Sequence, residues 1–194
     1  MDTFWKENKV IGNIAENIVE FLIESSLRWK CVKYGVENHI EELKKSLKDN
    51  NQDEISRRIR SMPDFIAINN ETNQVLLIDV KFRSFIDRRP ELDGDTLRKP
   101  ALYGFGYAQM KDYLQFWPEA YLVVVHNYDP FFIVIPLKDV QWHKHFHSRT
   151  KNDGHLYEQW NFIEIQKSIK DLFPDLSEET INKAIEMIPK KNGN

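Results

Sequence analysis

The sequence is poor in cysteine and has no long apolar run. Cys31 is the one cysteine among 194 residues, so the chain cannot form an internal disulfide, as is typical of a reducing cytosol. No apolar run approaches the roughly 20 residues of a membrane-spanning helix. The first residues lack the basic and apolar regions of a secretory signal. We therefore expect a cytoplasmic protein without a membrane partner, in which Cys31 is a small core residue.

The chain also lacks an excess of positive charge. Its 27 Lys and Arg residues stand against 30 Asp and Glu residues, which gives a formal net charge of −3. If such a protein binds nucleic acid, its basic residues must be concentrated on one face. A hydrophobic fraction of 41% and a charged fraction of 29% are typical of a globular protein. The length is that of one domain, or of one domain with small appendages.

Apolar periodicity predicts an α/β domain. Apolar residues recur at helical spacing from Ile11 to Leu22, which predicts a first helix over 11–28. The strand, helix, strand order between 75 and 126 implies a parallel pair, so we expect a mixed sheet. The other predicted elements are strands over 29–37, 64–69, 74–82, 121–126 and 131–136, short helices within 40–60, a polar loop over 84–103, and helices over 103–117, 162–172 and 178–188, the last capped by Ser177.

Two carboxylates and an ammonium fall at one edge of the hairpin predicted over 64–82. Asp64 opens its first strand, and Asp79 and Lys81 close its second, central strand. Asp79 and Lys81 are two residues apart, so their side chains point to the same face. Adjacent carboxylates repel unless a cation or a shared proton relieves them, and a hard divalent metal would provide that relief. The plainer interpretation is that Asp64 caps a turn and that Asp79 and Lys81 form a strand-end ion pair.

The order of these elements resembles the PD-(D/E)XK nuclease superfamily, which has the restriction-endonuclease-like fold. The matching residues are Glu16, Pro63, Asp64, Asp79, Val80 and Lys81. The segment from Gly12 to Glu16 is also similar to the Gly-x-x-x-Glu opening of archaeal Holliday-junction resolvases. The resemblance covers residues 11–137. It implies a mixed β-sheet flanked by helices. We expect a nuclease core over 1–140 and a C-terminal helical extension over 141–194, which the resemblance does not cover and which packs on the same domain.

The resemblance also implies a metal-dependent DNA endonuclease with no organic cofactor. Asp64 and Asp79 would bind Mg²⁺ or Mn²⁺, and the carbonyl of Val80 would be a further ligand. Glu16 would bind the metal directly or through water, and Glu20 would take that place if the helix were rotated. Lys81 would position or deprotonate the attacking water and stabilise charge near the scissile phosphate.

Five further residues are candidates for nucleic-acid binding. Gln109 and Tyr113 are similar to the Gln-x-x-x-Tyr element of RecB-like nucleases, whose residues face the DNA and the active site; the alternative is a polar pair on an exposed helix face. Arg57, Arg60 and Arg83 flank the acidic motif and predict a phosphate-binding surface. The alternative for these arginines is ordinary solvated charge.

Other functions and sites also fit the sequence. The chain is alternatively a nucleic-acid-binding or assembly protein that keeps this fold without cutting, or a nuclease whose substrate is RNA. DNA is the expected partner, and a homodimer is expected because cutting both strands of a duplex needs two active sites. His143, His145 and His147 would share one strand face and offer zinc ligands, or they serve the surface and the packing.

Overall fold

The computed structural model describes residues 2–35, 47, 53–83, 107–140, 145–148, 156–159 and 165–189, and the side chains of 10–35, 47, 53–83, 110–140 and 165–189 within them. The helices are α1 (Asp2–Ser25), α3 (Glu54–Arg60), α4 (Tyr107–Phe116), the short 3-10 helix η2 (Leu137–Asp139), α5 (Ile169–Leu172) and α6 (Glu178–Glu186). The strands are β1 (Trp29–Lys33), β2 (Phe65–Asn69), β3 (Val75–Arg83), β4 (Tyr121–His126), β5 (Phe132–Pro136), β6 (His145–Ser148) and β7 (Leu156–Gln159).

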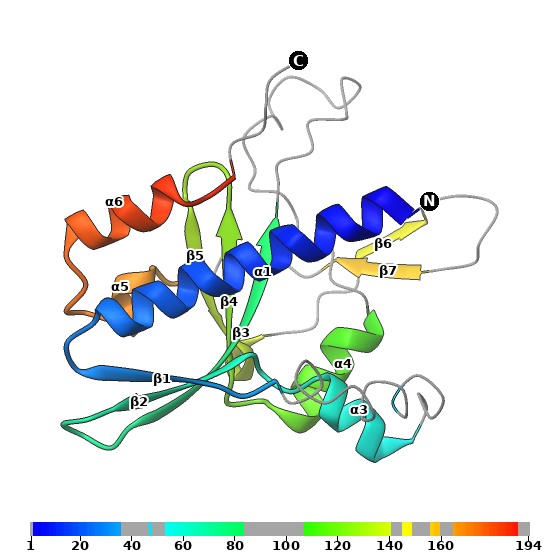
Figure 1. The fold of residues 1–194 in the computed structure, drawn as a ribbon. Helices are drawn as coiled ribbons and strands as arrows, with labels where there is room; N and C mark the ends of the chain where they lie inside the picture. The colour runs from blue at the N-terminus through cyan, green and yellow to red at the C-terminus, as the bar shows by residue number, and fades with distance from the viewer. Residues whose placement is uncertain are drawn as a thin grey trace.

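Five strands form one mixed sheet in the order β1-β2-β3-β4-β5 (Figure 1). β3 and β4 pair in parallel, and the other neighbours pair antiparallel. The parallel pair arises because α4 carries the chain from the end of β3 back to the start of β4. This confirms the predicted mixed α/β sheet and the central place of β3. β6 and β7 form a separate antiparallel ribbon.

The two faces of the sheet are covered by different helices. On one face, Ile18 and Leu22 of α1 share a core with Ile78 and Val80 of β3. On the other face, Met110 of α4 packs in a second core with neighbouring strand residues. Because side chains alternate along a strand, the even-numbered residues of β3 face α1 and the odd-numbered residues face α4. The side chains of residues 79 and 81 therefore belong to the α4 face.

The C-terminal helices pack on the α1 side of the sheet. Figure 1 shows α6 lying beside α1, and buried residues of both α5 and α6 join the core beneath α1. The ring of Phe173 meets that of Trp29 edge to face, with 5.4 Å between the ring centroids. Ser177 caps α6 by accepting a hydrogen bond from the backbone N–H of Thr180, as predicted.

Several predicted boundaries are wrong. α1 begins at Asp2 and ends at Ser25, whereas the apolar stripe used to predict it begins only at Ile11. β1 ends at Lys33. Of the helix predicted over 162–172, residues 165–168 are not helical, because Lys167 instead forms a β-bridge with Val134 at the edge of β5 and Ser168 caps α5 after it; residues 162–164 lie outside the described residues. The loop predicted over 84–103 and most of the segment 40–52 lie outside the described residues.

Candidate functional site

Asp64 lies directly opposite Asp79, at neighbouring positions of the antiparallel β2–β3 pair. The β2–β3 register pairs Phe65 with Ile78, so one further step places these two aspartates opposite each other. The backbone N–H of Val80 donates to Asp64 Oδ2 at 2.7 Å. Side chains directly opposite in an antiparallel pair project from the same face. The two carboxylates that the sequence predicted to meet are therefore neighbours on the α4 face of the sheet.

Lys81 supplies the positive charge at this pair. Its Nζ lies 2.6 Å from Asp79 Oδ2, and it donates to the backbone carbonyl of Val80 at 3.1 Å. The Asp79 side chain is 3% exposed and the Lys81 side chain 20% exposed. Asp79 Oδ2 is buried, and at 2.6 Å the Lys81 ammonium makes a short, charge-assisted contact with it.

Tyr113 of α4 contacts the other oxygen of Asp79. Its hydroxyl donates to Asp79 Oδ1 at 2.9 Å, and its ring centroid lies 5.6 Å from Lys81 Nζ. The residue is buried, so its placement on an exposed helix face is wrong. The resemblance suggested a residue facing the active site, and α4 does bring Tyr113 to Asp79; its predicted contact with nucleic acid stays a prediction. The side chain of Gln109 lies outside the described residues.

The electrostatics of the site favour an additional cation or a proton. Burial raises the pKa of Asp64 from 3.8 to about 8, with a further contribution from the charge on Asp79, and Lys81 opposes this rise. Burial lowers the pKa of Lys81, but the charges of Asp79, Tyr113 and Asp64 outweigh it and raise the pKa overall. Lys81 is therefore a cation at neutral pH, while the carboxylate pair still lacks positive charge.

The two glutamates of α1 that were proposed as metal ligands, Glu16 and Glu20, have different neighbours. Glu20 Oε2 lies 2.9 Å from the Nζ of Lys33 at the end of β1, so its charge is matched there. The half-buried Glu16 contributes to the raised pKa of Asp64. Among the described side chains, however, no three acidic, histidine or cysteine groups converge closely enough to hold a metal ion. α1 also packs on the face opposite Asp79, so metal binding by Glu16 stays a prediction.

The donor set at Asp64 and Asp79 fits a hard cation in type. Mg²⁺ is commonly bound by one or two carboxylates and keeps several of its waters. The two aspartates and the Val80 carbonyl supply such oxygens, and Asp79 Oδ2 is buried with the Lys81 ammonium as its cationic neighbour. The Lys81 ammonium contacts two of these three groups. A metal ion fits here if that ammonium moves away from Asp79.

The arginines predicted to bind phosphate differ in their surroundings. Arg57 forms an ion pair with Asp112 and donates to Gln115 at 3.2 Å, which ties α3 to α4. Its charge is thus matched inside the protein rather than solvated. Arg60 is exposed, and Arg83 donates to the backbone carbonyl of Phe82 at 2.8 Å. For all three arginines, nucleic-acid binding stays a prediction. Of the predicted zinc ligands, His143 and the side chains of His145 and His147 lie outside the described residues.

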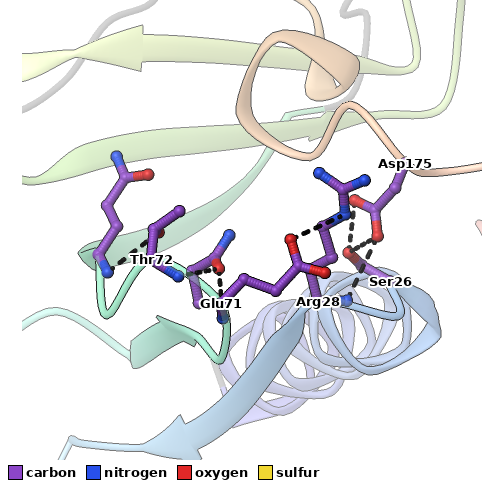
Figure 2. Close-up of polar contacts among 7 residues, drawn as sticks. Ser26, Arg28, Glu71, Thr72 and Asp175 are labelled. Atoms are coloured by element: carbon purple, nitrogen blue, oxygen red, sulfur yellow. Dashed lines mark hydrogen bonds and ion pairs between the residues drawn. The ribbon is translucent and has the colours of Figure 1, made fainter.

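A second polar cluster, which sequence reasoning missed, joins the C-terminal end of α1 to the turn between β2 and β3 (Figure 2). The Ser26 hydroxyl is 2.7 Å from each carboxylate oxygen of Asp175, and Arg28 Nε lies 3.5 Å from Glu71 Oε2. Arg28 and Asp175 also line an open pocket of about 230 Å³. Because these partners lie far apart in sequence, no local motif identifies the cluster.

A scan against protein-family models and a search of curated proteins found no match to the chain. The likeness to nucleases therefore depends on the residues of this chain alone. No helix in the described part of the chain is both long enough and apolar enough to cross a membrane.

Proposed function

We propose that the protein is a metal-dependent DNA endonuclease that hydrolyses phosphodiester bonds at Asp64, Asp79 and Lys81. The supporting observation is the pairing of two aspartates across β2 and β3 with one ammonium at 2.6 Å. Holding like charges together in a buried place costs free energy unless a cation compensates. Buried clusters of ionisable groups with perturbed pKa values occur preferentially at functional sites.

Four residues of the candidate site would bind the metal, and Lys81 is the fifth. Asp64, Asp79 and the Val80 carbonyl would hold Mg²⁺ or Mn²⁺, and Glu16 would reach it directly or through water. When bound, the metal would lower the pKa of a coordinated water and place positive charge at the phosphate. The attacking water gives up one proton as its oxygen bonds to phosphorus, the bond to the leaving sugar oxygen breaks, and that oxygen takes up a proton.

The resemblance gives Lys81 two roles, as a base for the attacking water or as a source of positive charge at the phosphate. A lysine that stays protonated cannot take a proton from water. It can donate hydrogen bonds to a phosphate oxygen whose negative charge grows as the reaction proceeds. Because the raised pKa of Lys81 comes from the charge of Asp79, which a bound metal would neutralise, both roles stay within the proposal.

A cleavage panel tests the proposed function. Duplex, branched and single-stranded DNA, with RNA in parallel, are incubated with purified protein and Mg²⁺ or Mn²⁺. We expect the wild type to cut DNA, and Asp64→Ala, Asp79→Ala and Lys81→Ala to lose activity by about 100-fold or more. Asp175→Ala removes a carboxylate from the second polar cluster and is the matched control, which should retain activity. If the wild type cuts no form of DNA, the proposal fails.

A non-catalytic nucleic-acid-binding or assembly protein is the second candidate function. Two observations favour it: Lys81 already pairs with Asp79, and the described side chains include no group of three metal-ligating residues. In that case the lysine would be a permanent counter-ion, and divalent metals would not bind. A measurement of mass in solution would separately test the expected homodimer, which would bring two sites to the two strands of a duplex.

A further inference from the structure

Two aromatic rings and an arginine lie beside the Asp64 strand end. The backbone N–H of Tyr34, the residue after β1, donates to the Asp64 carbonyl at 2.9 Å, which places Tyr34 next to the candidate site. Its ring meets that of Trp117 nearly at right angles, with 6.2 Å between the centroids. The Trp117 indole N–H donates to the Ser61 hydroxyl at 3.3 Å. Both residues are half-buried, and Trp117 also packs against the core between α4 and the sheet.

α4 connects this aromatic group to the carboxylates. The backbone N–H of Trp117 donates to the carbonyl of Tyr113 at 2.8 Å, which continues the helical bonding of α4 by one residue. Residues four apart on a helix share a face and are separated by about one turn, or roughly 5–6 Å. Tyr113 contacts Asp79, so Trp117 stands about one helical turn from the candidate site. That spacing is on the order of one to two nucleotides of a DNA strand.

Arg58 adds a positive charge to the group. Its guanidinium carbon lies 5.6 Å from the centre of the Trp117 ring. The residue is exposed, and in the part of the chain that the structure describes it forms no ion pair or hydrogen bond through its side chain. Its neighbour Arg57 is instead paired with Asp112. Of these two adjacent arginines, Arg58 is the one whose charge is available to a ligand.

We propose that Tyr34, Arg58 and Trp117 bind an unpaired stretch of the DNA strand that leads into the carboxylate site. Trp117 stacks on a base, and Arg58 pairs with a phosphate. Ring faces reach bases only where the strand is unstacked, so the ligand is single-stranded rather than duplex. Stacking on an aromatic ring accepts any base, so this surface holds the strand without reading its sequence. The inference extends the proposed function and rests on it, because the strand is placed so that it leads into the proposed cleavage site.

The test measures binding without cleavage. Fluorescence anisotropy follows a labelled thymidine oligonucleotide of about 15 nucleotides, near the site size of one single-strand-binding fold, and a duplex of the same length, both in EDTA. We expect the single strand to bind more tightly. Trp117→Ala should weaken its binding about ten-fold or more, and Trp117→Phe, which keeps an aromatic face, should weaken it less. Arg58→Gln should weaken binding and reduce the slope of log affinity against log salt by about 0.7.

Lys167→Gln is the matched control, because it removes one exposed positive charge at β5, the opposite edge of the sheet. It should change affinity by less than Arg58→Gln does. The inference is overturned if the wild type does not bind the single strand, or if Trp117→Ala and Arg58→Gln bind it like the wild type. Arg58 is exposed, so its variant is informative even if Trp117→Ala fails to fold.

The two proposals fail in different ways. If the variants lose binding but the wild type cuts no DNA with Mg²⁺ or Mn²⁺, the strand-binding surface of Tyr34, Arg58 and Trp117 is supported and the endonuclease proposal is rejected. If the wild type cuts DNA and the variants bind the single strand as the wild type does, the endonuclease proposal is supported and the strand-binding surface is rejected. RNA of the same length is measured in the same binding assay: an equal loss of RNA and DNA binding supports the proposed strand-binding surface, whereas a loss confined to RNA overturns its assignment to DNA.

Discussion

The two polar clusters at opposite ends of β2 use similar residues in different surroundings. At the Asp64 end, two carboxylates face one lysine, and the Asp79 side chain is 3% exposed. At the Ser26 end, shown in Figure 2, each carboxylate has its own partner, and Arg28 and Glu71 are 57% and 62% exposed. Water can replace a lost partner in the second cluster but not in the first. Charge compensation should therefore matter far more at Asp79 than at Glu71.

The loss in the free energy of unfolding should differ most between the two clusters when each loses its lysine or arginine. Lys81→Met leaves the buried Asp79 carboxylate without its counter-ion, and we expect a loss of about 3 kcal/mol in the free energy of unfolding. Arg28→Gln should cost about 0.5 kcal/mol or less, because the ion pair is exposed. Urea unfolding of both variants at neutral pH measures the difference.

A double variant checks the cause of that loss. Asp79→Asn combined with Lys81→Met removes both charges, so it should recover most of the stability that Lys81→Met alone loses. If the double variant is as unstable as the sum of the single variants, the loss comes from packing rather than from an unpaired charge.

Removal of a hydroxyl should have a smaller effect of the same kind. Tyr113→Phe deletes the donor to Asp79 Oδ1, and a hydrogen bond to a buried charged group is worth about 1.5–3 kcal/mol. Ser26→Ala deletes the donor to Asp175, which is accessible to water, and should cost about 1 kcal/mol. Equal losses in chemical denaturation would contradict the contrast between the clusters.

The two clusters should depend on pH with opposite signs. The raised pKa of Asp64 means that the folded state holds a proton which the unfolded state releases. Its contribution to stability is complete below pH about 4 and is lost as the pH rises through about 8. Burial opposes the charge of Asp175, but hydrogen bonds from Ser26 and from backbone N–H groups lower its pKa overall. Its contribution is present above its usual pKa and is lost as the pH falls through the lowered value.

Unfolding curves across this pH range check the signs. Asp64→Asn should flatten the fall in stability between pH about 4 and 8. Asp175→Asn should leave the change in stability between pH about 4 and 8 as it is in the wild type. It should reduce the loss of stability at more acidic pH. A wild-type protein whose stability rises through this interval, with no change in slope for Asp64→Asn, would contradict the assigned protonation of Asp64.

The sequence was sufficient for the parts of the fold that depend on local patterns. Alternation and apolar runs located β2, β3, β4 and β5 to within about one residue, because strand signals are short and bounded by turns. The order of strands and helix then required the parallel pair. Helix ends were less predictable, since α1 extends well beyond its apolar stripe and the backbone of Lys167 is bonded by a distant strand.

The site was predictable only in part. The hairpin register follows from its boundaries, so the meeting of Asp64 and Asp79 was accessible from the sequence. The resemblance suggested that Tyr113 faces the active site, but its contact with Asp79 and the pairing of Arg57 with Asp112 depend on how α4 packs against the sheet and α3. A periodic pattern shows which face of a helix is buried, but not which polar group it meets.

Calorimetric titration with Mn²⁺ in the absence of DNA tests the central claim most directly. The account predicts that the wild type binds Mn²⁺ and that Asp64→Asn and Asp79→Asn lose this binding, whereas Asp175→Asn retains it. Lys81→Met should bind at least as tightly as the wild type, because the ammonium that contacts Asp79 is gone. A wild-type protein with no affinity for Mn²⁺, or one whose affinity is unchanged in Asp64→Asn and Asp79→Asn, would contradict the proposed metal site.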